Sequence, residues 1–494
     1  MNEKVFDLAQ FTAYKDCPGQ YETAYIRSSG AVKVSETDAG VTVAVAESKA
    51  RSTVLFLQEY HAPKTVTILT VSDSAFAEFI GRLEVDTTVV KTTASSDGDT
   101  LFSLNAISES SPTVNIINAV CLEAIRRNAS DVHIEPLDAN MRIRFRLDGV
   151  LHTVKILPKS LFQSIANRIK IMANLNIMEQ RQPQDGRMRV SLGDDTHDFR
   201  VSIVPVNAGE SIVLRFFNTK TELLTLKELG FSPFALDALE KAVHIPNGLV
   251  LATGPTGSGK TTTLHALLHE MNSETEHIIT IEDPIERVLS GINQIQVNYE
   301  INLTFDNLLR RILRQDPNVI MVGEIRDAET ADLALRAALT GHILLSTLHT
   351  NDSIAAISRL VNMGIEPFLI ASVLRYVTAQ RLVRKVCPSC KKEIPTPDFF
   401  KALQKKYNVP ESHTLFAESG CEQCNHTGFS GRTVIGEIFV VDSEIETMIS
   451  ERKNIAMITG YAQNHGMETL ESDAVKKVSA GITTLGEVIR ETIL

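Results

Sequence analysis

The hydrophobic and polar positions of the chain change their periodicity several times, and each change predicts a new group of elements. Residues 1–92 mix short apolar runs, such as GVTVAVAES and KTVTILTV, with polar segments, which predicts a small α/β domain. The segment 93–107 is rich in serine, threonine, aspartate and glycine and poor in apolar residues. Such a composition predicts a linker.

Residues 108–216 predict a second α/β domain with a curved sheet. Apolar residues recur at helical spacing over 112–127, and the run MRIRFRL at 141–147 alternates apolar residues with arginines. This alternation is typical of a strand with one buried face and one exposed face. A further short linker is expected at 217–226.

The third part, residues 227–386, alternates continuous apolar runs with helical segments. The runs GLVLAT, HIITIE, NVIMV and HILLSTL lack a polar face, as expected for strands of a parallel sheet that is covered on both sides. Two CxxC pairs interrupt this pattern over 387–432, and residues 433–494 predict mostly amphipathic helix. The whole chain is therefore predicted to be an α/β protein of several parts.

Charge and composition narrow the possible functions. The 494 residues carry a formal net charge of −11, aromatic residues make up 6%, and tryptophan is absent. These values argue against nucleic acid as the main partner, since such proteins usually present a basic face. No apolar run of about 18 residues occurs, and the N-terminus lacks the apolar stretch of a secretory signal. A cytoplasmic location is expected.

The segment GPTGSGKT matches the complete phosphate-binding pattern G-x-x-x-x-G-K-[ST] and lies between an apolar strand and a helix. Glycines let the loop wind tightly, so that its backbone N–H groups face the β-phosphate of ATP. Lys260 adds a positive charge, and Thr261 offers a hydroxyl to Mg²⁺. The residues predicted to bind ATP are Gly254, Pro255, Thr256, Gly257, Ser258, Gly259, Lys260, Thr261 and Thr262.

Acidic residues follow two of the apolar runs, Glu282 after IITI and Glu324 after NVIMVG. Because parallel strands bring their carboxyl ends to one edge of the sheet, both acids should lie beside the phosphate-binding loop. One carboxylate can hold the water shell of Mg²⁺ and the other can orient the attacking water. Capping of neighbouring helices is the alternative. A Gly-Glu pair replaces the usual aspartate, so the division of roles stays open.

The run TGHILLSTLHTND places His342 and His349 at the two ends of one apolar strand. We expect this strand beside the strand of the phosphate-binding loop. An imidazole there can contact the γ-phosphate or the carboxylate that positions water, so a sensing or catalytic role is favoured over a structural one. A shared metal is disfavoured, because the two side chains lie seven positions apart along one strand.

The four paired cysteines are predicted to bind one structural zinc ion. The pairs CPSC and CEQC are separated by 30 residues, which include a predicted helix. Each pair can present two thiolates to one point, and four thiolates complete a tetrahedral Zn²⁺ site without an open position for water. A redox pair is the alternative. The predicted ligands are Cys387, Cys390, Cys421 and Cys424.

Together, these motifs resemble the secretion ATPase superfamily. GPTGSGKTTTL, TIEDPIE, LRQDPNVIMVGEIRDAETA and TGHILLSTLHTNDS look like its Walker A motif, Asp box, Walker B motif and His box. Upstream, ASDVHIEP, RFRLDGV and RQPQDGR also match. The resemblance covers about residues 110–494. It is strongest to type II secretion ATPases, followed by type IV pilus assembly ATPases.

The resemblance implies a RecA-like ATPase core and a homo-hexamer that uses ATP and Mg²⁺. It gives Glu282 the Asp-box role, Glu324 the Walker B role, and His342 and His349 the His-box roles. Arginines of the family reach the nucleotide phosphates, some from another subunit, although a surface or ion-pair role is the alternative for each. The matching residues are Arg200, Arg215, Arg310, Arg314 and Arg326.

The resemblance also implies the partners. They are an inner-membrane platform protein and the cytoplasmic domain of a membrane-anchored secretion component, and they would hold the chain at the inner membrane. A DNA-translocating RecA-like ATPase is an alternative, but the acidic charge and few aromatic residues disfavour it. A nucleotide-gated adaptor without turnover is disfavoured by the presence of both glutamates and both histidines.

Overall fold

The computed structural model describes residues 112–192, 195–217, 223–491 and 493, preceded by 26, 29–37, 39–49, 54, 57, 58, 61, 64–76 and 101–103. Parts of both predicted linkers lie outside the described residues. The chain forms two compact units, residues 1–118 with 190–195, and residues 119–189 with 196–494. Within the described part, no helix is both long and apolar enough to cross a membrane.

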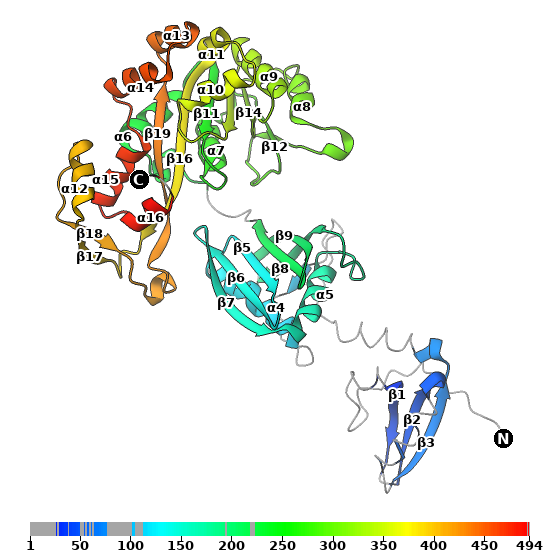
Figure 1. Ribbon diagram of the computed structural model, residues 1–494. Coiled ribbons are helices and arrows are strands. Elements are labelled where there is room, and N and C mark those ends of the chain that lie inside the picture. Colours follow the sequence, from blue (N-terminus) through cyan, green and yellow to red (C-terminus); the bar gives the residue numbers. More distant parts are fainter. Residues whose placement is uncertain are drawn as a thin grey trace. The chain divides into compact units, whose positions relative to one another are not determined.

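The N-terminal part contains a three-stranded sheet in the order β1-β2-β3 (Figure 1). Strand β2 pairs antiparallel with β1 and parallel with β3, and the strands are β1 (Ala31–Glu36), β2 (Gly40–Ala46) and β3 (Thr65–Val71). The apolar residues of β2 are buried, as the runs in this region predict. No side-chain cluster that could hold a metal occurs among the described residues of this part.

The second sheet has seven strands in the order β4-β8-β9-β10-β5-β6-β7. Helix α4 (Pro112–Arg126) forms where the sequence predicts a helix, and α5 (Phe162–Met172) is a second helix of this part. The strands are β4 (Leu101–Ser103), β5 (Asp131–Pro136), β6 (Asn140–Leu147), β7 (Val150–Pro158), β8 (Gln184–Leu192), β9 (Asp195–Val206) and β10 (Gly209–Phe217). Residues 101–103 form the edge strand of this sheet. The prediction of a linker over 93–107 is therefore wrong for these three residues.

Strand β6 shows the predicted alternation. Met141, Ile143 and Phe145 are buried, whereas the arginines between them lie on the other face. Arg142 and Arg144 both bind Glu135 of the neighbouring strand β5, and the Arg142 contact measures 2.9 Å. The exposed face of this strand is thus held by cross-strand ion pairs.

The third sheet carries the phosphate-binding loop and has the order β13-β12-β14-β15-β11-β16-β19. All neighbouring strands are parallel except β16 and β19, as expected from the unbroken apolar runs. The strands are β11 (Gly248–Thr253), β12 (Ile278–Glu282), β13 (Asn293–Gln296), β14 (Val319–Val322), β15 (Ile343–Leu348), β16 (Leu374–Val386) and β19 (Phe429–Val440).

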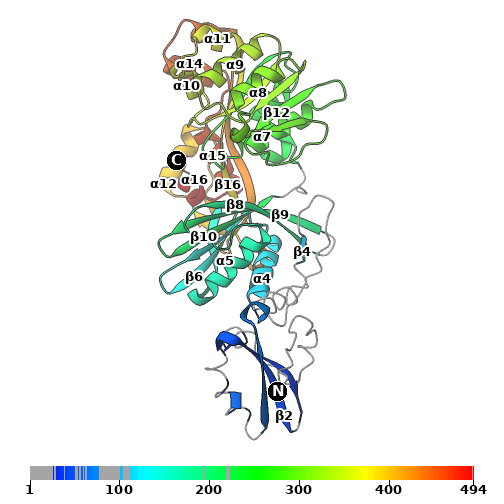
Figure 2. The same ribbon diagram turned by 90° about the vertical axis from the view of Figure 1, so that its right-hand side faces the viewer.

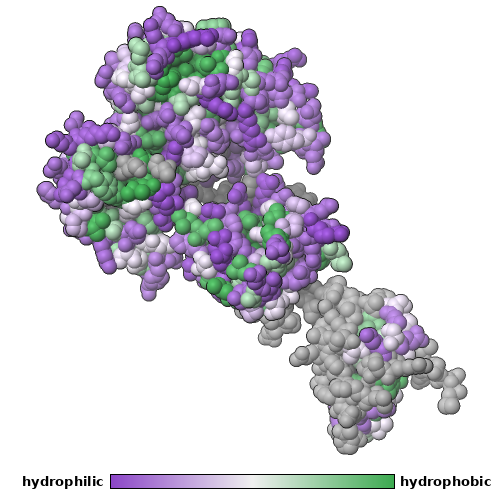
Figure 3. Space-filling model, in the orientation of Figure 1, coloured by the Kyte–Doolittle hydropathy of each residue, from purple (hydrophilic) through white to green (hydrophobic). Residues whose placement is uncertain are grey.

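Helices cover both faces of this sheet (Figure 1 and Figure 2). Leu249 and Leu251 of β11 face one core, which is shared with α8 (Phe305–Ile312), α9 (Ala328–Leu339), α10 (Ala355–Asn362) and α11 (Pro367–Val373). Val250 and Ala252 face the other core, which is shared with α6 (Pro233–Ala242) and α7 (Lys260–Met271). The result is a three-layer α/β/α domain. The face of it that Figure 3 shows is mostly hydrophilic, with apolar patches between the polar residues.

Strands β16 and β19 form a long antiparallel hairpin, and the cysteine module is inserted at its tip (Figure 1). Val386 and Phe429 are direct partners in the register of this hairpin. The inserted segment contains β17 (Lys392–Pro395), α12 (Asp398–Lys406), β18 (Thr414–Ala417) and the short helix η7 (Glu422–Cys424). The predicted boundary at residue 432 is therefore wrong, because β19 spans residues 429–440 and joins the sheet.

Four helices follow β19 in the described part of the chain: α13 (Ser443–Ser450), α14 (Ile455–Asn464), α15 (Leu470–Ser479) and α16 (Leu485–Arg490). The helical prediction for the C-terminal region is confirmed for these residues. Val475 of α15 and Val488 of α16 share a core with Phe400 of α12 and Leu415 of β18. The last two helices are thus packed against the cysteine module.

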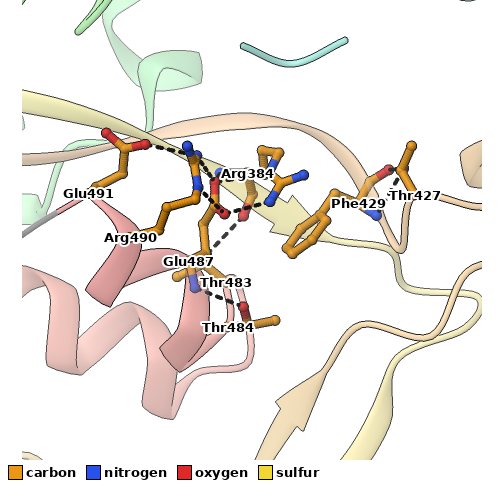
Figure 4. Close-up of polar contacts among 8 residues, drawn as sticks. All are labelled: Arg384, Thr427, Phe429, Thr483, Thr484, Glu487, Arg490 and Glu491. Carbon is orange, nitrogen blue, oxygen red and sulfur yellow. Dashed lines mark hydrogen bonds and ion pairs between the residues drawn. The ribbon is translucent and has the colours of Figure 1, made fainter. Parts of the chain in front are cut away.

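A buried carboxylate fixes α16 to the hairpin (Figure 4). Glu487 is 2% exposed and accepts hydrogen bonds from the backbone and guanidinium of Arg384 and from Arg490, at distances between 2.7 and 3.1 Å. Burial would raise the pKa of Glu487, but the two arginines lower it to about 2. The Arg384 guanidinium also lies 3.8 Å from the centre of the Phe429 ring.

Glu487→Gln is expected to destabilise the C-terminal region by about 3 kcal/mol at pH 7. Because the folded-state pKa lies below the ordinary value of 4.5, the carboxylate stabilises the protein above that value. This stabilisation is lost as the pH falls toward 2. The difference between variant and wild type, measured by denaturant unfolding, should shrink to roughly half by pH 3.

Glu491→Gln is the matched control, because Glu491 binds the same Arg490 at 2.7 Å but is 25% exposed. It should cost less than about 1 kcal/mol. An equal loss for Glu487→Gln at pH 7 and pH 3 would show that its charge does not stabilise the fold.

Candidate functional site

A cavity of about 470 Å³ lies at the edge of the third sheet where the parallel strands end. The phosphate-binding loop between β11 and α7 forms one wall, and the segments that follow β12, β14 and β15 form the others. The predicted ATP-binding residues on this wall are Thr256, Gly257, Ser258, Gly259, Lys260, Thr261 and Thr262. Gly254 and Pro255 begin the same loop.

The loop needs its glycines for conformation and for space. Gly257 and Gly259 have φ angles of 81° and 89°, in the left-handed region that favours glycine. A Cβ atom on Gly254 would lie 2.5 Å from the backbone oxygen of Gln380, a residue of β16. The loop therefore winds tightly against β16, at a distance that leaves no room for a side chain on Gly254.

Several groups of the loop fit a phosphate. Lys260 Nζ lies 2.8 Å from Gly254 O and 3.1 Å from Pro255 O, and burial lowers its pKa. The hydroxyl of Ser258 is buried and has no hydrogen-bond partner among the described residues. Helix α7 begins at Lys260 and directs the positive end of its dipole to this point.

Glu282 is the last residue of β12 and lines the cavity from a buried position. Its carboxylate accepts hydrogen bonds from Thr280 at 2.7 Å and Gln294 at 2.9 Å, and it lies 3.2 Å from His265 Nε2. Burial would raise the pKa of Glu282, but these hydrogen bonds, led by His265, lower it. The site therefore holds a fixed, ionised carboxylate.

Glu324 follows β14 and is more accessible, with a side chain that is 19% exposed. It forms an ion pair with Arg326, and its carboxylate lies 3.8 Å from His349 Nε2. Burial and the charge of Lys260 lower the pKa of His349, although Glu324 opposes them. The structure thus brings Lys260, Glu282, Glu324, Arg326 and His349 to one cavity, as the motifs predict for these five.

His342 is not brought to this cavity. Strand β15 runs parallel to β11, as predicted. The N-terminal end of β15 therefore lies at the sheet edge opposite the phosphate-binding loop. His342 precedes β15, and its Nδ1 lies 2.9 Å from Ala337 O at the end of α9. The expectation that both histidines flank the nucleotide is therefore wrong within one chain, because strand direction separates them.

Only Arg326 of the five predicted arginines lines the cavity. Arg310 lies on α8 and forms an ion pair with Glu329, and Arg314 is exposed just beyond that helix. Arg200 and Arg215 lie in the second sheet as register partners on β9 and β10. Arg215 is 68% exposed and binds Asp131 at 2.8 Å.

The four cysteines of the inserted module come together as a second site. All four Sγ atoms lie within 4.8 Å of one another, and three of the separations measure 3.7, 3.8 and 4.0 Å. Tetrahedral zinc with Zn–S bonds of about 2.3 Å places its sulfurs about 3.8 Å apart. Backbone N–H groups of Cys421 and Gly428 donate to Cys424 Sγ at 3.2 Å, which supports a thiolate.

Sequence reasoning missed the polar residues that hold the ATP site in place. His265 has a detectable signal, since it is a polar residue within the apolar run of α7. Gln294 and Gln380 have no local signal, because they reach the site only through the order of the strands.

The fold and the cavity together define a P-loop ATPase with RecA-like architecture. The chain belongs to the Type II/IV secretion system protein family, whose profile matches residues 106–490. It is 45% identical to the type II secretion system ATPase E of Vibrio cholerae over 390 residues, covering 78% of this chain and 76% of that protein.

Two further similarities help to place the chain. The type IV pilus assembly ATPase PilB of Myxococcus xanthus is 42% identical over 388 residues, covering 78% of this chain and 68% of that protein. The crystal structure of the pilus retraction motor PilT with bound ADP is 28% identical, with a TM-score of 0.52 over 75% of this chain and 95% of that chain. These findings confirm the predicted superfamily.

Proposed function

We propose that this protein is the motor ATPase of a type II secretion system, which hydrolyses ATP to drive pseudopilus assembly and protein export. The observation that carries the ATPase activity is the convergence of Lys260, Glu282, Glu324 and His349 on one cavity. The similarity to type II secretion proteins, including 46% identity to the type II secretion system protein E of Pseudomonas aeruginosa, supports the secretion role. Pilus assembly is the alternative.

The cavity supplies groups for the phosphates of ATP, for Mg²⁺ and for the attacking water. Backbone N–H groups of the loop and Lys260 hold the β- and γ-phosphates, and Thr261 offers its hydroxyl to Mg²⁺. Glu282 and Glu324 supply, between them, a carboxylate for the water shell of Mg²⁺ and one that orients the attacking water. His349 lies close enough to Glu324 to respond when the γ-phosphate leaves.

The arginines outside the cavity suggest how the chains assemble. A phosphoryl-transfer transition state spreads negative charge over its oxygens, and an added arginine is worth about 10³–10⁵ in rate. Arg200 and Arg215 belong to a different sheet from the cavity, and Arg310 and Arg314 do not line it. We therefore assign the working form to a homo-hexamer in which such arginines complete the site after domain movement or across a subunit boundary.

The remaining parts of the proposal concern partners and location. Residues 1–92 dock on the cytoplasmic domain of a membrane-anchored secretion component, and the ATPase core acts on an inner-membrane platform protein. These contacts place the chain at the cytoplasmic face of the inner membrane through its partners. The four-cysteine module takes Zn²⁺ as a structural ion, since the donor set leaves no position for a reacting water.

Deletion of the gene in its source organism tests the secretion role. Exported proteins should accumulate inside the cell envelope, while pilus fibres on the surface stay at their normal level. Culture supernatants and sheared surface fibres are measured by immunoblot, with complementation by the wild-type gene as the control. Loss of pili with undisturbed export would favour the pilus assembly alternative.

A further inference from the structure

Gln380 occupies an unusual position in the middle of β16. It is fully buried and belongs to the strand next to β11, on the side away from β15. Both polar atoms of its side-chain amide form hydrogen bonds with groups outside the sheet. Nε2 donates to Ser258 O at 2.9 Å, and Oε1 accepts from Thr263 Oγ1 at 3.0 Å. One side chain thus contacts the phosphate-binding loop and the helix that follows it.

The contact with Ser258 controls the direction of a backbone donor. A peptide group is planar, so the carbonyl of Ser258 and the N–H of Gly259 point in opposite directions. Because Gln380 holds this carbonyl on the β16 side of the loop, the N–H of Gly259 is turned away from β16. Gly259 lines the cavity, and a Cβ atom added to it would lie 3.2 Å from Gln380 Nε2.

The contact with Thr263 fixes the position of the first turn of helix α7 relative to β16. Thr263 is fully buried in the first turn of that helix, two residues after Thr261 and three after Lys260. Gln380 therefore links the backbone donors of the loop with the side chains that flank the phosphates. The next residue of β16, Arg381, donates to Asn351 O at 3.1 Å, in the segment after His349.

We propose that Gln380 is a positioning residue for ATP hydrolysis, which aligns the phosphate-binding loop with helix α7. A buried amide in a strand is costly unless both of its ends are hydrogen-bonded, and here both bonds serve the phosphate site rather than the sheet. This inference rests on the proposed ATPase activity. It adds a residue that no motif of the sequence contains.

The test compares Gln380→Met with Thr378→Val in the full-length protein. Gln380→Met keeps the length of the side chain and removes both hydrogen bonds, so kcat should fall by about 10- to 100-fold. KM and the Kd for ADP should change less than kcat. Thr378 lies two residues earlier, is equally buried, and its hydroxyl has no hydrogen-bond partner among the described residues. Thr378→Val should keep wild-type kcat.

Thr263→Val provides a second variant in case Gln380→Met fails to fold. It removes only the donor to Gln380 Oε1, so kcat should fall by a smaller factor. The double variant should be no worse than Gln380→Met, because both changes act on one contact.

Wild-type kcat in either single variant would overturn the inference, as would an equal loss in Thr378→Val. If the wild-type protein does not hydrolyse ATP, the result counts against the proposed function instead. The Kd for ADP then still shows whether Gln380→Met disturbs the phosphate-binding loop.

Discussion

Lys260→Ala is expected to abolish ATP turnover while the fold stays intact. Among the described residues, Lys260 is the only lysine that lines the cavity. Its ammonium group lies beside the carbonyls of Gly254 and Pro255. Removal of one such preorganised charge typically costs about 10²–10³ in rate. Phosphate release by the purified variant measures turnover, and circular dichroism with thermal unfolding measures the fold.

Lys241→Ala is the control, since Lys241 is 68% exposed and pairs with Asp237 outside the cavity. It should turn over ATP at the wild-type rate, because an exposed ion pair contributes about 0–1 kcal/mol. Hydrolysis by Lys260→Ala at the rate of Lys241→Ala would contradict the assigned phosphate site.

The same variant can test the assignment of the arginines in the second sheet. Chains with Lys260→Ala and chains with Arg200→Ala should each be inactive alone. If Arg200 acts across a subunit boundary, a mixed ring contains some sites that are complete, and part of the turnover returns. Activity of mixtures is measured against the unmixed variants at the same total concentration.

The second large effect is expected at the four-cysteine site. Purified wild-type protein should contain about one zinc ion per chain, and Cys421→Ser should contain little or none. Because binding of a structural zinc ion contributes directly to folding, the inserted module should unfold. Helices α15 and α16 share a core with that module, so they should become sensitive to protease as well. Metal analysis and limited proteolysis check both results.

Cys121→Ala removes a cysteine outside the module and serves as the control. Cys121 is fully buried in α4, and burial raises its pKa to about 12, so it stays a thiol and does not take part in zinc binding. Its removal should leave the zinc content unchanged. One zinc ion per chain in Cys421→Ser would contradict the four-ligand assignment.

The sequence predicted those parts of the site that depend on local order along the chain. The phosphate-binding loop combines an apolar strand, three glycines and a helix within one segment, so Lys260 could be assigned without knowing the rest of the fold. Glu282 and Glu324 followed from the rule that parallel strands end at one edge. The cysteine pairs needed only their spacing.

Other parts depend on strand direction and strand order, which no local pattern contains. His342 and His349 look equivalent in the sequence, but the parallel pairing of β15 with β11 leaves only His349 at the cavity. Residues 433–440 were assigned to the helical region, yet they pair with β16 and extend the sheet. Gln380 reaches the loop only because β16 lies next to β11.

The register of the β16–β19 hairpin makes the inserted segment separable from the sheet. Val386 and Phe429 are direct partners, so the chain leaves the sheet and re-enters it at points about 5 Å apart. Residues 387–428 therefore occupy the position of a simple turn, and a gain or loss of this segment changes neither the strand order nor the ATP cavity. Only α15 and α16 depend on the module beyond the hairpin, because these helices share its core and would lose that cover without it.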